Sequence, residues 1–148
     1  MSINCIRTLI EDTNASNPNK VALIYGNEKL TYNQLFVKVN QIAYYLSELD
    51  LPKGSRIGVY SNKGIDQVVA ILAILSTQYV LVPLTKLLKP EQAEYIISDC
   101  DIECIITDKI KLESIEEIKF DGHIISYETT HKDLPSFEEI YKYYNKPY

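Results

Sequence analysis

The feature that most constrains the fold is an alternation of short apolar runs and helical patterns between residues 56 and 126. The apolar runs predict four strands, at Arg56–Tyr60, Tyr79–Val82, Glu103–Thr107 and His123–Ser126. The segments between them predict three helices, at Ile65–Leu75, Pro90–Ser98 and Lys111–Ile118. Strands joined through helices make right-handed crossovers, which place the strands parallel in one sheet with helices on its faces. The predicted fold class is therefore α/β, with a layered, largely parallel sheet flanked by helices.

Two of the predicted strands are almost continuously apolar, namely Tyr79–Val82 and Cys104–Thr107. A strand that helices cover on both faces has this composition, because neither of its faces meets water. We therefore expect both faces of these two strands to be buried.

A small N-terminal β-hairpin is predicted before this alternation. Val21–Tyr25 has the composition of a strand, residues 26–27 form a Gly-Asn turn, and Lys29-Leu30 begins a return strand. The following Thr31-x-x-Gln34 has the spacing of a capping box, in which each side chain bonds the backbone N–H of the other residue. The sequence thus predicts a hairpin that leads directly into a capped helix.

The remaining elements lie at the two ends of the chain. We expect a short amphipathic helix at Ile3–Glu11, a polar loop at Thr13–Lys20, and a linker at Tyr127–Pro135. Ser136-x-x-Glu139 forms a second capping box, which opens a helix through Tyr144. The first long helix is expected to end near Asp50, before Pro52 and Gly54. The predicted organisation has three parts: an N-terminal helix and loop at 1–17, an α/β subdomain at 18–126, and a linker with a C-terminal helix at 127–148.

Composition and charge exclude several classes of partner. The chain has 148 residues, of which 46% are hydrophobic, and this is enough for a core. Its formal charge of −5, with lysines interleaved among acidic residues, argues against nucleic acid and against an anionic membrane surface as partners. The most apolar stretch, Val68–Leu84, is shorter than the ~20 residues that span a bilayer. Three cysteines and an N-terminus without a secretory signal predict a cytoplasmic protein with free thiols.

Three features raise the question of a binding site. Gly64 lies between a strand and a helix, where an anion could bind, but a lone glycine outside any G-x-G pattern more simply allows a turn. Cys100 and Cys104 have a spacing that zinc permits, yet they lack further soft ligands nearby. We therefore interpret Cys104 as a core residue, and Cys100, at a helix C-terminus, as a poor nucleophile.

The other polar and aromatic candidates also have structural explanations. His123 and His131 do not lie near a serine or cysteine in a recognisable nucleophile setting. The acidic run formed by Glu113, Glu116 and Glu117 has the pattern of a solvated helix face. Four tyrosines near the C-terminus predict a partly packed aromatic end: Tyr141, Tyr143, Tyr144 and Tyr148. We predict no catalytic, cofactor-binding or metal-binding residue in this chain.

Several motifs together resemble the N-terminal portion of the adenylate-forming superfamily, which contains acyl-CoA synthetases, peptide-synthetase adenylation domains and luciferases. Leu30-Thr31-Tyr32-x-x-Leu35 resembles the first core motif of this superfamily, and Leu75-x6-Val82-Pro83-Leu84 resembles the second. Lys53–Val59 resembles the strand-entry segment between them. The likeness covers Pro18 to Asp108. It departs at Thr77-Gln78, where an Ala-Gly pair is usual, and at Thr85, where Asp or Asn is common.

One further segment is similar to a particular branch. Leu87–Gln92, with Ile96–Cys100, is most like the acyl-CoA-ligase-like proteins found beside exosortase and exopolysaccharide systems. The resemblance implies a partial copy of the large lobe of an AMP-forming ligase. In such an enzyme a carboxylic acid attacks the α-phosphate of ATP, pyrophosphate leaves, and a thiol then displaces AMP.

The resemblance implies no catalytic residue here, because the phosphate loop, the magnesium ligand, the ribose-binding aspartate and the C-terminal lysine follow the first two motifs. We expect ATP and magnesium, a carboxylic acid, and CoA or a carrier protein to serve the full-length parent, whose remainder is the expected partner of this chain. The first hypothesis is an inactive N-terminal fragment of such a ligase. The alternatives are a non-catalytic binding or assembly module on the same scaffold, and a small nucleotide binder, which the absence of a glycine fingerprint argues against.

Overall fold

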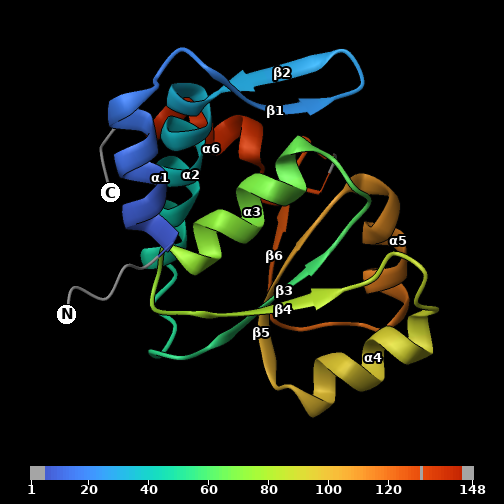
Figure 1. The fold of residues 1–148 in the computed structure, drawn as a ribbon. Coiled ribbons are helices and arrows are strands. Elements are labelled where there is room, and N and C mark those ends of the chain that lie inside the picture. The colour runs from blue at the N-terminus through green and yellow to red at the C-terminus, as the bar shows by residue number, and fades with distance from the viewer. Residues whose placement is uncertain (1–5, 131, 145–148) are drawn as a thin grey trace.

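A four-stranded parallel sheet with the order β4-β3-β5-β6 forms the centre of the fold (Figure 1). The computed structural model describes residues 6–130 and 132–144. The strands are β3 (Arg56–Tyr60), β4 (Val80–Leu84), β5 (Ile102–Thr107) and β6 (His123–Ser126). Each begins within one residue of its predicted start, and all three neighbouring pairs are parallel. The predicted α/β class, with a parallel sheet between helices and a separate small hairpin, is confirmed.

Helices cover both faces of this sheet, and the strand residues alternate between two cores. One core lies between the sheet and α3 (Ile65–Leu75), where Ile57 and Val59 of β3 are buried. The other lies under α4 (Pro90–Asp99) and α5 (Lys109–Glu117), where Tyr60 is buried. Figure 1 shows α3 on one side of the strands and α4 and α5 on the other side. Successive side chains of a strand point to opposite faces of the sheet, so each strand contributes side chains to both cores.

The expectation that both faces of Tyr79–Val82 are buried is wrong. The strand begins at Val80, lies at the edge of the sheet beside β3, and leaves Val80 47% exposed. Val80 donates its N–H to the Ser55 carbonyl oxygen, so in a parallel ladder Pro83 faces the free edge. A proline is tolerated there because its missing N–H has no partner to lose. The same expectation is confirmed for β5, in which Cys104 to Thr107 are all buried.

The predicted hairpin and the helix after it form as expected. β1 (Val21–Tyr25) pairs antiparallel with β2 (Glu28–Thr31), and Gly26 turns the chain with a φ of 58°, which favours glycine. Thr31 and Gln34 form both bonds of the capping box at the start of α2 (Tyr32–Ser47). α2 contributes seven buried residues, and its apolar ones belong to the core between the sheet and α3, which we call the main core. Leu23 and Leu30 of the hairpin pack against this core, so the hairpin is anchored to it.

The N-terminal helix is longer than predicted. α1 spans Ile6–Ser16, so the loop expected from Thr13 begins only at Asn17. The Thr13 hydroxyl donates to the Leu9 carbonyl oxygen at 2.7 Å, and the Ser16 hydroxyl donates to that of Asp12 at 2.9 Å. These bonds back to the preceding turn let polar residues remain helical. The first three residues of the predicted helix, 3–5, lie outside the described residues.

The C-terminal helix α6 (Phe137–Tyr143) packs on α2 and completes the main core. Ser136 forms the predicted capping box with Glu139, and Phe137 is only 1% exposed. The Phe137 ring lies 5.0 Å from the ring of Tyr127, which is itself buried although it begins the predicted linker. The division into three parts stays a prediction. Among the described residues, no helix is both long enough and apolar enough to cross a membrane.

Candidate functional site

The carboxyl ends of the parallel strands converge on one edge of the sheet, where the connecting loops leave room for a site. After β3 the chain crosses to β4 on one side, whereas after β5 it proceeds to β6 on the other side. This reversal opens a crevice between the ends of β3 and β5, and open α/β sheets bind their ligands at such a switch point. The candidate site therefore lies among the residues that follow these strands.

A hydrogen-bonded clamp closes the bottom of this crevice. Asn62, just after β3, donates its backbone N–H and its side-chain Nδ2 to Oδ2 of Asp108, at 2.6 and 2.9 Å. Oδ1 of Asp108 accepts the N–H of Lys111 at 2.8 Å and so caps α5. With both of its oxygens occupied and its side chain buried, Asp108 holds two strand ends together and has no free carboxylate oxygen for chemistry.

Buried hydroxyl groups extend this clamp toward β6. The Thr107 hydroxyl donates to the Tyr60 carbonyl oxygen at 2.7 Å, and the hydroxyls of Ser61 and Tyr127 lie 2.9 Å apart. Burial raises the pKa of the Tyr127 phenol well above its usual value. Tyr127 is therefore a neutral hydrogen-bonding group at physiological pH and cannot serve as a phenolate base.

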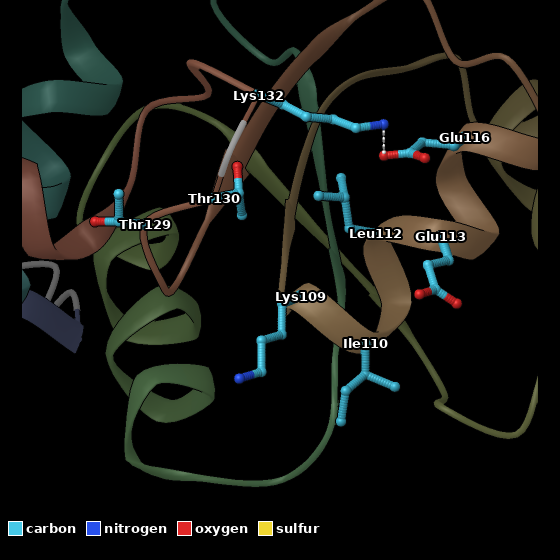
Figure 2. A pocket seen from close by; sticks show the side chains of 8 residues that line it. All are labelled: Lys109, Ile110, Leu112, Glu113, Glu116, Thr129, Thr130 and Lys132. Carbon is cyan, nitrogen blue, oxygen red and sulfur yellow. Dashed lines mark ion pairs between the residues drawn. The ribbon is translucent and has the colours of Figure 1, made fainter.

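One hollow at this edge, of about 570 Å³, lies between α5 and the residues Thr129, Thr130 and Lys132 (Figure 2). An ion pair between Lys132 and Glu116 spans it, with Lys109 and Ile110 at the start of α5 below. Its charges are mixed, and no serine or cysteine stands beside a base among its described lining residues. The hollow therefore offers electrostatic contacts, and its described lining contains no serine or cysteine nucleophile.

A second hollow, of about 410 Å³, lies between the hairpin, α2, α3 and α6. Lys38 and Asp66 face it from α2 and α3, and Tyr141 faces it from α6. Burial lowers the pKa of Lys38, and burial raises the pKa of Asp66, because each loses water around its charge. A smaller crevice of about 250 Å³ shares Asp66 with this hollow and reaches the clamp residues Asn62 and Asp108.

The structure places Gly64 at the start of α3, as the sequence predicts. Its φ of 172° is extended backbone that any residue adopts, and no atom lies within 4 Å of an added Cβ, so the backbone there does not require glycine. Asp66 puts negative charge in the first turn of the same helix. This charge opposes an anion at the position where a helix N-terminus would otherwise attract one.

The cysteine and histidine candidates do not assemble a site within the described part of the chain. Burial raises the pKa of the Cys104 thiol to about 12, which makes it a core residue without a reactive thiolate. His123 lies opposite Cys104 in the strand register, yet it is exposed at the start of β6. Over residues 6–130 and 132–144, no three His, Cys, Asp or Glu side chains gather as metal ligands would. Cys5 and His131 lie outside the described residues.

Sequence reasoning missed the residues that organise this edge, which are Lys38, Asn62, Asp66, Asp108 and Tyr127. One signal was available, because Asn62 and Asp108 follow predicted strands whose carboxyl ends must meet at the same edge of a parallel sheet. For Lys38 and Asp66 no such signal exists, since each occupies a polar position of an ordinary amphipathic helix.

Comparison with known proteins places this architecture in a family. The family model described as "AMP-binding enzyme" matches residues 10–146. Gramicidin S synthase 1 of Brevibacillus brevis is 33% identical over 123 residues, which are 83% of this chain and 11% of that protein. Tyrocidine synthase 1 of Brevibacillus parabrevis is 29% identical over 120 residues, which are 81% of this chain and 11% of that protein. The chain thus spans about a tenth of the length of these curated relatives.

A solved structure shows the same fold. The anthranilate CoA ligase AuaEII, in complex with anthranoyl-AMP, superposes with a TM-score of 0.86 at 24% sequence identity. The superposition covers 97% of this chain and 28% of that enzyme. The described elements, hairpin included, therefore have the arrangement found in part of a larger ligase.

Proposed function

The chain belongs to the AMP-binding enzyme family, and from this premise we propose that it is the N-terminal part of an AMP-forming ligase. The observation that carries the proposal is the family match over residues 10–146. The small share of each relative that this chain spans supports it. The parent activates a carboxylic acid with ATP and transfers the acyl group to a thiol, of CoA or of a carrier protein. The compartment that we propose is the cytoplasm.

The described residues do not fit ATP and magnesium. The N-terminus of α3 would be the natural place for a phosphate, but Asp66 there and Glu28 and Glu128 around it would repel an anion. Asp108, the best-placed carboxylate at the switch point, has both oxygens occupied. We therefore assign no step of the reaction to this chain. Its proposed role is structural, since its buried strands and capped helices support the part of the ligase that binds nucleotide.

The remainder of the ligase is the partner that we propose. Large apolar side chains are exposed on the hairpin at Ile24 and Tyr25, on the edge strand at Val80, and after it at Leu87. We propose that these side chains pack against the remainder of the ligase. The assignment to the branch beside exosortase systems stays a prediction.

An ATP–pyrophosphate exchange assay tests the proposal. The purified chain of 148 residues is incubated with ATP, magnesium, labelled pyrophosphate and a pool of carboxylic and amino acids. A complete adenylation domain, assayed in parallel, serves as the positive control. We expect incorporation of label by this chain to stay at background, because carboxylates outnumber ammonium groups in the crevice at the start of α3. Exchange above background that depends on an added acid would contradict the proposal.

A non-catalytic binding or assembly module is the second candidate, and the packing of α6 favours it. Phe137 and Ile140 are 1% and 2% exposed, so the last described helix completes the core. A complete module should unfold in one cooperative, reversible transition as a monomer. A fragment that needs the rest of the ligase should instead aggregate or lose its fixed packing before it unfolds.

A further inference from the structure

The hollow between the hairpin, α2, α3 and α6 joins the crevice at the ends of β3 and β5. We call the two together the Asp66 cleft, because Asp66 lines both. Ile65, Tyr127, Glu28 and Glu128 also line both parts. The cleft opens at the carboxyl edge of the parallel sheet, which is where α/β sheets hold ligands.

The Asp66 carboxylate is half-buried in this cleft without a partner. It makes no hydrogen bond or ion pair within 4 Å to any residue that the structure describes, although Lys38 attracts it from a longer distance. Two of the neighbouring carboxylates already accept hydrogen bonds. Glu128 accepts the N–H of Lys109 at 3.0 Å, and Glu138 accepts the Thr129 hydroxyl at 2.8 Å. Asp66 is thus a desolvated charge for which a ligand could supply the missing partner.

Lys38, one of the lysines that line the cleft, is held by an aromatic ring. Nζ of Lys38 lies 3.7 Å from the centroid of the Tyr141 ring, a cation–π contact. The Tyr141 hydroxyl is buried and has no hydrogen-bond partner in the part of the chain that the structure describes. The cleft therefore already shows how it accommodates an ammonium group, on an aromatic face among carboxylates.

The balance of charge decides which ligand this cleft can take. Four carboxylates line its larger hollow, from Glu28, Asp66, Glu128 and Glu138, against the two ammonium groups of Lys29 and Lys38. A phosphate or carboxylate ligand would meet net repulsion. A divalent metal is also disfavoured, since no three ligand side chains converge within the described residues. The aromatic rings of Tyr127, Phe137 and Tyr141 favour an organic cation over a hydrated ion.

We propose that the Asp66 cleft binds a small organic cation, a primary ammonium compound without a carboxylate group, with Asp66 as its ion-pair partner. The ammonium group donates to the Asp66 carboxylate, and the alkyl stem packs on the ring of Tyr127. An amino acid does not fit, because its own carboxylate would face the acidic wall. This binding does not depend on the ligase function proposed above.

The test titrates the ¹⁵N-labelled full chain with n-butylammonium chloride and follows the backbone amide shifts. We expect saturable shifts that concentrate at residues 61–67 and 127–128 and in α6. Equal concentrations of 1-butanol and of 4-aminobutyrate should give neither the same pattern nor saturation. Loss of the ion pair in Asp66→Asn should weaken butylammonium binding about tenfold. Asp99→Asn, on the exposed end of α4, is the matched control and should bind as the parent chain does.

Circular dichroism first establishes that both variants are folded, and we expect both to be. The proposal is overturned if butylammonium produces no saturable shifts in the parent chain, or if butanol produces the same shifts. It is equally overturned if Asp66→Asn binds butylammonium as tightly as Asp99→Asn.

Discussion

At the scale of single residues, Asp66 carries two opposing electrostatic effects. A carboxylate in the first turn of a helix usually gains from the helix dipole, whereas burial without a partner costs free energy. Burial raises the pKa of Asp66 above its unfolded value, and Glu28, Glu128 and Glu138 add to this effect against the opposing attraction of Lys38. Because the pKa of Asp66 is raised overall, the ionised carboxylate destabilises the folded chain. A ligand that neutralised it would remove this cost.

Replacing Asp66 by asparagine should therefore raise the free energy of unfolding at neutral pH, by less than about 1 kcal/mol because solvent screens this half-buried charge. Below the unfolded pKa the parent carboxyl is protonated in both states, so the gain should vanish. The gain grows as the pH rises above the unfolded pKa and is complete once the pH exceeds the raised pKa of the folded state. Urea unfolding of parent and variant at about pH 3 and about pH 7 measures both limits. A variant less stable than the parent at neutral pH would show that the helix dipole outweighs burial.

At the scale of elements, the capping boxes decide where two helices begin. The Ser136 hydroxyl accepts the N–H of Glu139 at 3.3 Å and is fully buried. Ser136→Ala should lower the free energy of unfolding by about 1 kcal/mol, because the first turn of α6 loses a partner. Ser98→Ala, on the exposed side of α4, is the control and should change stability by less than about 0.5 kcal/mol. Urea midpoints measure both, and equal midpoints would mean that the cap contributes nothing.

The elements that sequence predicts best are those with local chemical causes. Thr31, Ser136 and Pro90 begin helices through interactions within four residues, and all three starts are confirmed. The exposure of β4 could not be predicted, because an apolar run does not say whether a strand has one neighbour or two. The extension of α1 to Ser16 could not be predicted either. Thr13 and Ser16 can bond to backbone groups in a helix or in a loop, and the sequence does not show which conformation is more stable.

At the scale of the whole molecule, the fold followed from the alternation of strands and helices, and the candidate site did not. The order β4-β3-β5-β6 creates the switch point, and strand order is a property of tertiary packing. Asn62 meets Asp108 across 46 residues of sequence, and Lys38 meets Tyr141 from opposite ends of the chain. The position of Asn62 and Asp108 after predicted strands indicates only that they lie at the same edge, and the pair of Lys38 and Tyr141 has no local sequence signature. The order of the motifs, by contrast, was enough to predict the family.

We propose that this chain is a structural part of an AMP-binding family ligase and that its described residues form no nucleotide site of their own. The most direct test is isothermal titration of the full chain with ATP and magnesium at low ionic strength, where weak electrostatic binding would be strongest. We expect no saturable heat, because Glu28, Asp66 and Glu128 outnumber Lys63 in the crevice that the phosphates would enter. Saturable binding of one ATP per chain would contradict it.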